Sequence, residues 1–590
     1  MIIMVKLKNR MQKNNIENIR HSFAHLTNIA VRKFYPKAQP AIGPAIENGF
    51  YQDFGNLNIS KEDLPKIEKE IRSIAKQNLT FKKELWPFRK VVDFYKKEKQ
   101  PYKVQIAKDL VKEKKLTKLG IVRTGDILVD LCRGGHVKNT RELPLDAFKL
   151  THVAGAYWRG DEKNPMLTRV YGLAFAEKKE LDEYLAFLEE AKKRDHKRLG
   201  QELDLFSFHP EAPGFVFWHP KGMLLRQALM SLHHELHRKA GYQEVSTPIL
   251  LSEDLWKRSG HWDNYKDNMY FTKIDNRVFA IKPMNCPGTI LVYKVRPRSY
   301  KELPIRFAEA GEVHRHEPSG TLNGLMRVRA FRQDDTHIFA QPDQVEQEVI
   351  DVIRLTLQFY RIIGLKEPHI ELSTKPEKYI GSLAMWRKAE STLKKILNDL
   401  KIDYKINKGD GAFYGPKIDF HVKDSLGRSW QLGTIQLDFS MSERFDVTYI
   451  DKDGRQKRPV IIHRTVIGSI QRFMGVLIEH FAGAFPTWLA PEQVWIVPIS
   501  DKFLSYAKDV QQRLLKDYPA LRVVVKEENE TLGKKIREGE VQKIPYLAVV
   551  GEKEQAQGTL SPRKRGKGNL GAMKIDAFAK ILEKEIKEKN

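Results

Sequence analysis

Residues 281–288 read Ile281-Lys282-Pro283-Met284-Asn285-Cys286-Pro287-Gly288, and this stretch contains one of the two cysteines of the chain. Two histidines stand in equally unusual surroundings, His337 after Asp334-Asp335-Thr336 and His463 between Ile462 and Arg464. One thiolate and two imidazoles form a suitable zinc ligand set, and three protein ligands leave a fourth position open for substrate. No C-x-x-C or H-x-x-x-H pair joins the three residues, so spacing alone indicates little. A lone Cys or His is more often packed in a core.

The composition around this stretch is that of a globular protein with several domains. The chain has 590 residues, of which 41% are hydrophobic and 30% charged, and this length predicts about three or four domains. No apolar run approaches the ~18 residues of a membrane span, and the N-terminus lacks a signal-peptide core, so we expect no membrane association. Two cysteines exclude a disulfide framework and favour the reducing cytoplasm.

The net charge is +27, from 102 Lys and Arg against 75 Asp and Glu. Such an excess favours a polyanionic partner such as nucleic acid. Because the lysines are spread widely, a generally lysine-rich composition explains the charge equally well.

The pattern along the chain divides it into five segments. Residues 1–15 are basic and polar and are expected to be a flexible lead-in, and residues 16–175 mix helix and strand patterns. Residues 176–200 are charged with apolar residues at helical spacing, which predicts an exposed linker helix. Residues 201–491 contain alternating strands such as 418–422 and 430–432, which suit an antiparallel sheet with one face covered. In residues 492–590, strands at 494–497, 521–525 and 546–550 alternate with helical patterns, which predicts a small α/β domain.

Five long strings occur in a characteristic order along residues 16–590. They are Ile281-Lys282-Pro283-Met284-Asn285-Cys286-Pro287-Gly288, His314-Arg315-His316-Glu317-Pro318-Ser319-Gly320, Gly324-Leu325-Met326-Arg327-Val328-Arg329, Gly411-Ala412-Phe413-Tyr414-Gly415-Pro416-Lys417 and Phe485-Pro486-Thr487-Trp488-Leu489-Ala490-Pro491. With these strings the chain resembles the bacterial-type threonyl-tRNA synthetases, which are class II aminoacyl-tRNA synthetases. The resemblance implies an α+β multidomain fold: an α/β editing domain, a class II catalytic domain whose antiparallel sheet is flanked by helices, and a C-terminal α/β anticodon-binding domain.

The implied reaction joins L-threonine to ATP as threonyl-adenylate and then transfers threonine to tRNA(Thr). Attack at the α-phosphate needs positioning and positive charge more than a protein nucleophile. Arg315 resembles the motif 2 arginine, which holds the carboxylate and the α-phosphate together, and Arg472 resembles the motif 3 arginine, which binds the γ-phosphate. Magnesium is expected to bridge the phosphates. The resemblance also implies nucleotide contacts from Glu317, Arg327, Phe331 and Gln431.

Zinc on Cys286, His337 and His463 is implied to bind the amino and hydroxyl groups of threonine. Threonine and valine are nearly isosteric, and a site that engages the hydroxyl can reject its absence by about 10⁴ or more. Asp335 is expected to accept a hydrogen bond from the hydroxyl. Met284, Gln333 and Tyr414 would line the same pocket. His261 matches a histidine implicated in the transfer step, where it helps to deprotonate the terminal ribose hydroxyl, although a structural loop histidine is the alternative.

Serine also carries a hydroxyl and is smaller than threonine, so a second, hydrolytic site is the physical remedy. His21-Ser22-Phe23-Ala24-His25 and Cys132-Arg133-Gly134-Gly135-His136 resemble the editing domain shared with alanyl-type enzymes. His21, His25, Cys132 and His136 also form a plausible metal set. In this family, however, the cluster is thought to hydrolyse Ser-tRNA with an activated water, and we assign it to catalysis together with Lys103 and Asp130. The usual small domain ahead of the editing domain is expected to be missing.

The C-terminal block resembles an anticodon-binding domain, where carboxylates and arginines read the edges of splayed bases. Asn529, Arg537, Glu554 and Arg563 fall at the expected reading positions. Residues 241–248 resemble motif 1 of the class II synthetases. The family uses this motif at a two-fold interface, so a homodimer is expected.

Two other functions are compatible with parts of the sequence. A synthetase-like RNA-binding regulator without catalysis should lack some of Arg315, Arg472 and the three zinc ligands, and all of them are present. A free editing hydrolase would not need these activation motifs, so their presence argues against that function as well.

Overall fold

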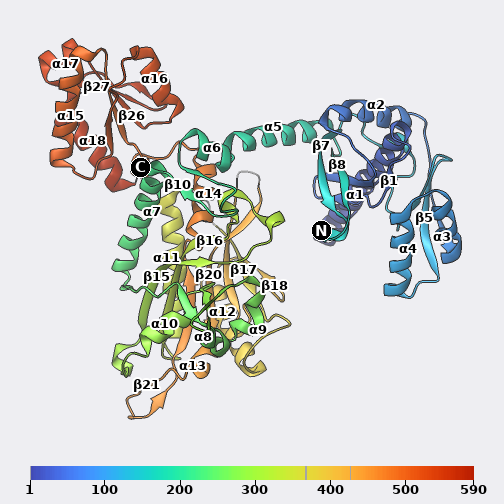
Figure 1. Cartoon of the computed structure of the whole chain (residues 1–590), viewed down its shortest axis with the longest axis horizontal. Coiled ribbons are helices and arrows are strands. Elements are labelled where there is room, and N and C mark those ends of the chain that lie inside the picture. The colour runs from blue at the N-terminus through green and yellow to red at the C-terminus, as the bar shows by residue number, and fades with distance from the viewer. Residues whose placement is uncertain (1, 366–367, 425–426, 590) are drawn as a thin grey trace. The chain divides into compact units, whose positions relative to one another are not determined.

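The computed structural model describes residues 2–365, 368–424 and 427–589. Backbone contacts divide the chain into two compact units, Met1–Glu189 and Glu190–Asn590. Figure 1 shows the elements of both units, which are considered separately below.

The first unit is built on a sheet with strand order β1-β3-β8-β7, in which β2 also pairs with β3. Its strands are β1 (Gln39–Pro40), β2 (Ala45–Ile46), β3 (Gly49–Gly55), β7 (Phe148–Tyr157) and β8 (Met166–Ala174). The helix α1 (Ile2–Phe34) buries apolar residues between Ile19 and Val31, and α2 (Leu64–Ala75) buries Leu64, Ile67 and Ile71. Phe23, Phe50 and Phe148 are almost completely buried in the common core. Burying such side chains is the main stabilising term for a unit of this size.

A smaller subdomain of the same unit contains a sheet with order β4-β5-β6. These strands are β4 (Phe81–Pro87), β5 (Lys118–Thr124) and β6 (Leu128–Leu131), and they are accompanied by α3 (Phe88–Lys97) and α4 (Pro101–Lys114). Trp86, Tyr95 and Ile121 form its buried core.

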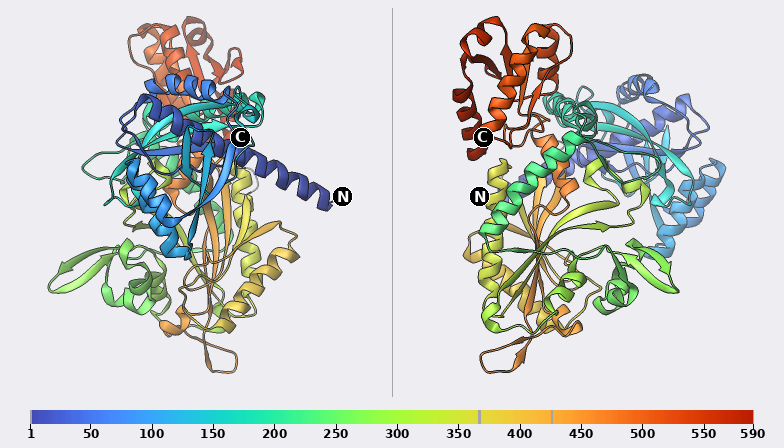
Figure 2. Two further views of the ribbon diagram at one scale, coloured as in Figure 1. Left: turned by 90° about the vertical axis from the view of Figure 1, so that its right-hand side faces the viewer. Right: turned by 60° about the vertical axis from the view of Figure 1, so that its left-hand side comes forward.

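Within residues 1–15, expected as a flexible lead-in, the structure describes the first part of α1, which begins at Ile2 (Figure 2). This stretch contains neither Gly nor Pro, so nothing in it interrupts a helix. The linker over residues 176–200 is helical but not one helix. It consists of α5 (Lys178–Arg194) and α6 (His196–Glu202), separated at Asp195, whose side chain caps α6 by accepting from the Lys197 amide.

The second unit contains an eight-stranded sheet with order β11-β15-β16-β23-β20-β19-β17-β18. Its interior pairs are antiparallel, as expected, while the edge pairs β11–β15 and β17–β18 are parallel. The strands are β11 (Gln243–Glu244), β15 (Ile305–His314), β16 (Ala330–Ala340), β23 (Val460–Thr465), β20 (Ser429–Asp438), β19 (Lys417–Lys423), β17 (His369–Ser373) and β18 (Tyr404–Asn407).

Helices cover one face of this sheet and bury its apolar residues. The helices α7 (Pro220–Lys239), α11 (Val345–Ile363), α12 (Leu383–Asp399) and α14 (Ile470–His480) contribute to one core with the sheet (Figure 2). Leu229, Ile353 and Phe473 in that core are at most 1% exposed. A smaller sheet, β12 (Leu250–Ser252), β13 (Tyr270–Ile274) and β14 (Arg277–Ile281), precedes α10 (Cys286–Tyr293).

The C-terminal part has the predicted strand-helix alternation. The strands β24 (Val494–Pro498), β25 (Val523–Val525) and β26 (Tyr546–Val550) are parallel, and β27 (Thr559–Lys564) joins β26 antiparallel. The helices α15 (Leu504–Asp517), α16 (Leu532–Val541), α17 (Glu552–Gln557) and α18 (Ile575–Glu588) complete this α/β layer.

Candidate active site

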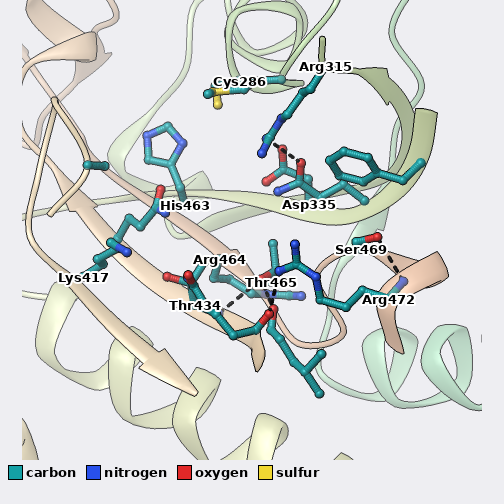
Figure 3. Close-up of a pocket in the computed structure, with 18 of the residues that line it drawn as sticks. Cys286, Arg315, Asp335, Lys417, Thr434, His463, Arg464, Thr465, Ser469 and Arg472 are labelled. Atoms are coloured by element: carbon teal, nitrogen blue, oxygen red, sulfur yellow. Dashed lines mark hydrogen bonds between the residues drawn. The ribbon is translucent and has the colours of Figure 1, made fainter. Parts of the chain in front are cut away.

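A cavity of about 380 Å³ opens over the large sheet of the second unit. The side chains of Cys286, Arg315, His463 and Arg472 converge on it (Figure 3). Most of the residues predicted from the sequence to bind ATP, threonine or zinc line this cavity. They are Met284, Cys286, Arg315, Glu317, Arg327, Phe331, Gln333, Asp335, Tyr414, Gln431, His463 and Arg472.

Strand pairing brings the three predicted zinc ligands together. His337 on β16 is the register partner of His463 on β23, and their ring centroids lie 4.8 Å apart. Cys286 begins α10, and the ligand atoms of all three residues lie within 4.8 Å of one another. Both nitrogens of His337 and Nδ1 of His463 are buried without a hydrogen-bond partner. Such unpaired buried groups are costly in a protein interior, so this set fits a metal ion with N and S ligands.

A carboxylate fixes the orientation of one of these imidazoles. Asp438 Oδ2 lies 3.0 Å from His463 Nε2, so Nδ1 is the ring nitrogen left to face the cluster. Metal-binding histidines usually donate their second ring nitrogen to such a group. Sequence reasoning missed Asp438, because nothing near it in the chain resembles a ligand motif.

Asp335 lies beside the cluster at the cavity wall and is only 4% exposed. Burial raises the pKa of Asp335 to about 6, and the Asn285 amide donates to its Oδ2 at 3.2 Å. The Tyr414 hydroxyl donates to Gln436 Oε1 at the same cavity. The pocket therefore offers an acceptor, Asp335, next to the three potential metal ligands.

Away from the three potential metal ligands, the cavity is lined by Arg315, Arg327 and Arg472. Arg315 donates from Nε to Pro283 O at 3.1 Å, and its guanidinium lies 5.1 Å from the Phe331 ring centroid. Arg472 donates from Nε to Met326 O at 2.9 Å and from Nη1 to Gln431 O at 3.0 Å. Burial, with the nearby Arg327 and Arg315, lowers the pKa of Arg472 to about 10. These side chains still carry like charges near neutral pH, so the arrangement favours a polyanion between them.

A buried network holds the backbone that leads to Arg472. Asp334 Oδ2 accepts from the amides of Val466 and Ile467 at 2.7 and 3.0 Å. Its Oδ1 lies 2.8 Å from His233 Nε2 and 3.3 Å from Arg464 Nη1. The carboxylate therefore fixes the connection between β23 and α14.

His261 is fully buried behind the cavity wall. Its Nδ1 lies 2.7 Å from Ser259 Oγ and its Nε2 lies 3.0 Å from Met284 Sδ. Burial lowers the pKa of His261 to about 3, so the imidazole is neutral near pH 7. The structure does not bring it into the described lining of the cavity, and its role in transfer stays a prediction.

Lys417 and Thr434 also line the cavity but were not assigned from the sequence. Lys417 Nζ lies 3.0 Å from both Asp410 Oδ2 and Asp419 Oδ2. Lys417 ends one of the strings quoted above, which was the signal that could have identified it.

The second predicted cluster forms in the first unit. His21 and His25 on α1 face Cys132 and His136, and the four ligand atoms lie within 4.8 Å of one another. Cys132 Sγ lies 3.4 Å from His21 Nε2 and 3.3 Å from His136 Nε2. Burial holds the pKa values of His25 and His136 well below the ordinary value and raises the pKa of Cys132 to about 11.

The two remaining members of this cluster form a buried ion pair. Lys103 on α4 lies 2.5 Å from Asp130 on β6, and Asp130 Oδ2 is 3.5 Å from His25 Nε2. All six predicted residues are therefore close together, although they come from three separate stretches of sequence.

The predicted anticodon residues occupy the C-terminal part. Asn529 and Arg537 are exposed, while Glu554 and Arg563 are partly buried. Glu554 accepts from Ser561 Oγ at 2.7 Å and from the Gly551 amide at 3.1 Å. Glu554 is therefore held in place by its own domain, whereas Asn529 and Arg537 are free to meet solvent.

Comparison with known protein families assigns the three parts of the chain. Residues 270–481 match the tRNA synthetase class II core domain (G, H, P, S and T), and residues 493–585 match the anticodon binding domain. Residues 119–171 match the threonyl and alanyl tRNA synthetase second additional domain. The fold and the arginine-lined cavity thus define a class II aminoacyl-tRNA synthetase.

Individual relatives narrow the family. The chain is 54% identical over 571 residues to the threonine–tRNA ligase of Carboxydothermus hydrogenoformans, covering 97% of this chain and 89% of the relative. The corresponding ligase of Acetivibrio thermocellus is 53% identical, covering 97% and 88%. A crystal structure titled as the RNA binding domain of threonyl-tRNA synthetase from Cryptosporidium parvum Iowa II is 40% identical with a TM-score of 0.64, covering 66% of this chain and 98% of that one.

The chain belongs to the threonine–tRNA ligase family. This membership supports the catalytic ligase over an RNA-binding regulator without catalysis. Among the described residues, no helix combines the length and the apolar character that crossing a membrane requires.

Proposed function

We propose that the cavity of the second unit binds ATP and threonine together and forms threonyl-adenylate. The observation that carries this proposal is the convergence of Arg315, Arg327 and Arg472 on one cavity. Arg315 would hold the threonine carboxylate against the α-phosphate, while Arg327 and Arg472 would bind the outer phosphates. Mg²⁺ would bridge those phosphates. Glu317, Phe331 and Gln431 would contact the nucleoside.

Cys286, His337 and His463 would hold a zinc ion at the amino-acid end of the cavity. When bound, zinc supplies an open coordination position that orients the amino and hydroxyl groups of the substrate. Asp335 would accept from the threonine hydroxyl, and Met284, Gln333 and Tyr414 would close the pocket around it. Valine has no hydroxyl to donate to Asp335, so this buried carboxylate would lose one hydrogen bond.

ATP–pyrophosphate exchange with threonine, serine and valine tests both assignments. Each amino acid is measured with and without a zinc chelator, and excess zinc is added back as a control. We expect exchange with threonine, weaker exchange with serine, none with valine, and loss of exchange on chelation. Exchange that survives complete removal of zinc would refute the zinc assignment.

The cluster of His21, His25, Cys132 and His136 would hydrolyse mischarged Ser-tRNA(Thr). A neutral imidazole would remove a proton from water as the water oxygen bonds to the ester carbon, and the products are serine and tRNA with a free ribose hydroxyl. The low pKa values of His25 and His136 support neutral imidazoles here. The Lys103–Asp130 pair would fix the position of His25. Substituting His136 by Ala should abolish Ser-tRNA hydrolysis and leave aminoacylation unchanged.

The C-terminal part would read the anticodon through Asn529, Arg537, Glu554 and Arg563, with a salt-dependent contribution from neighbouring basic residues. A homodimer would form around residues 241–248. Its support is the edge strand β11 together with the exposed apolar residues Ile249 and Leu250, which are 46% and 37% exposed. The two free, buried cysteines suit a reducing cytoplasm.

A further inference from the structure

His196, the first residue of α6, is only 1% exposed, and both of its ring nitrogens are used. Its Nδ1 lies 2.7 Å from Glu479 Oε1 on α14, and its Nε2 accepts from the Leu325 amide at 3.0 Å. A backbone N–H can only donate, so the ring proton resides on Nδ1 and Nε2 carries the lone pair. Both ring nitrogens are therefore occupied, and the neighbouring Asp195, His196 and Glu479 do not form a metal site.

The Leu325 amide belongs to the loop that carries ATP-site groups. Leu325 lies in a short helical turn, Gly324–Met326, whose last carbonyl accepts from Arg472 Nε at 2.9 Å. Arg327 follows directly and lines the cavity. Leu325, whose amide bonds His196, is thus one residue from the Met326 carbonyl that Arg472 contacts and two residues from Arg327.

The loop is also packed against the imidazole. Gly324 has φ of +49°, and a Cβ placed on it would collide with His196 Nε2. The Leu325 side chain is fully buried in the main core. The imidazole therefore packs against the buried side of this loop. Solvent cannot replace the hydrogen bond between the Leu325 amide and His196 Nε2 if that bond is lost.

We propose that His196 is a positioning residue for the triphosphate end of the ATP site. Its Nε2 holds the Leu325 amide, which sets the direction of the Met326 carbonyl and so the place of the Arg472 guanidinium and of Arg327. Glu479 holds the imidazole in the required tautomer. The inference rests on the proposed roles of Arg327 and Arg472 in binding ATP.

Two substitutions separate the two hydrogen bonds of His196. The amide of Gln reaches about as far as Nε2, so H196Q can still accept from the Leu325 amide. The amide of Asn reaches about as far as Nδ1, so H196N can bond Glu479 but leaves the Leu325 amide unpaired. Both variants carry a side-chain amide. They differ in the hydrogen bond that they keep, which is the bond from the Leu325 amide in H196Q and the bond to Glu479 in H196N.

The test is ATP–pyrophosphate exchange on the full chain, with KM measured separately for ATP and for threonine. We expect H196N to raise the KM for ATP about tenfold, which corresponds to about 1.4 kcal/mol, with the KM for threonine within twofold of wild type. H196Q should restore the KM for ATP to within threefold. An unchanged KM for ATP in H196N, or an equal rise in both variants, would overturn the inference. If His196 had only a structural role, the KM for ATP would not depend on whether residue 196 can accept from the Leu325 amide.

Two further variants keep the result interpretable. If H196N does not fold, Gly324→Ala disturbs the same contact from the loop side, and an unchanged KM for ATP there overturns the inference. Arg472→Ala tests the underlying ATP assignment. If Arg472→Ala leaves the KM for ATP unchanged, the assignment fails; if it raises that KM and H196N does not, only the positioning role of His196 fails.

Discussion

Asp438→Asn should weaken zinc binding without removing any ligand. Asp438 is fully buried, and its Oδ1 accepts from the amides of Ser440 and Met441 at 2.6 and 3.0 Å. Those two donors are fixed by the backbone, so the Asn oxygen must face them and the Asn NH₂ must face His463. His463 Nε2, now opposite a donor, must become the acceptor, and the ring proton moves to Nδ1. The nitrogen that faces Cys286 and His337 is then blocked.

The expected size follows from the orienting role of such partners. Losing the hydrogen bond that orients a metal-binding histidine typically costs 10- to 100-fold in affinity, which is about 1.4 to 2.7 kcal/mol. Zinc affinity is measured by competition with a chromophoric chelator, and exchange activity is followed against free zinc. Activity should return at high zinc, because all three ligands remain.

A matched control is Asp451→Asn, which alters another buried carboxylate whose partner is Lys457, in the hairpin of β21 (Tyr449–Ile450) and β22 (Gln456–Lys457). It should leave zinc affinity unchanged. A zinc Kd for folded Asp438→Asn within threefold of wild type would refute the reasoning about the tautomer of His463.

Asp335→Asn should reduce the preference for threonine over valine, measured as the ratio of kcat/KM values for exchange, about 10- to 100-fold. The reason is that hydrogen bonds to charged groups contribute about 1.5–3 kcal/mol. An unchanged ratio would exclude Asp335 as the acceptor for the threonine hydroxyl. Ser-tRNA hydrolysis should change less than twofold between pH 7.5 and 5.5, because the depressed pKa values of His25 and His136 keep both imidazoles neutral as pH falls. A histidine of ordinary pKa, about 6.5, would lose about tenfold over that range, and such a decline in single-turnover rates would contradict the proposal. Lys103→Met should lower the free energy of unfolding of the first unit by about 3–5 kcal/mol in denaturant unfolding, because Asp130 would stay buried without its ion-pair partner. A decrease of less than about 1 kcal/mol in that free energy would show that Asp130 finds another partner. Ile249→Asp should shift the sedimentation of the chain from dimer to monomer, and an unaltered profile would place the interface elsewhere.

Local sequence patterns were sufficient where a segment's structure depends on its own residues. The strands at 494–497 and 546–550 and the helical patterns between them are present in the C-terminal part, because continuous apolar runs bounded by polar turns have few other stable arrangements. The basic and polar composition of residues 1–15 favoured a flexible lead-in, whereas α1 begins at Ile2 in a stretch without a helix breaker.

The sequence by itself indicated the chemistry proposed for this protein, because the string 281–288 carries the candidate ligand Cys286 and the string 324–329 carries Arg327. Only the tertiary structure decided how those strings meet. His337 and His463 become neighbours through the register of β16 and β23, and Asp438 reaches His463 from β20. His196 and Leu325 are 129 residues apart in the chain yet share a hydrogen bond. Strand register and side-chain burial arise from packing over the whole unit, so no window of sequence contains them.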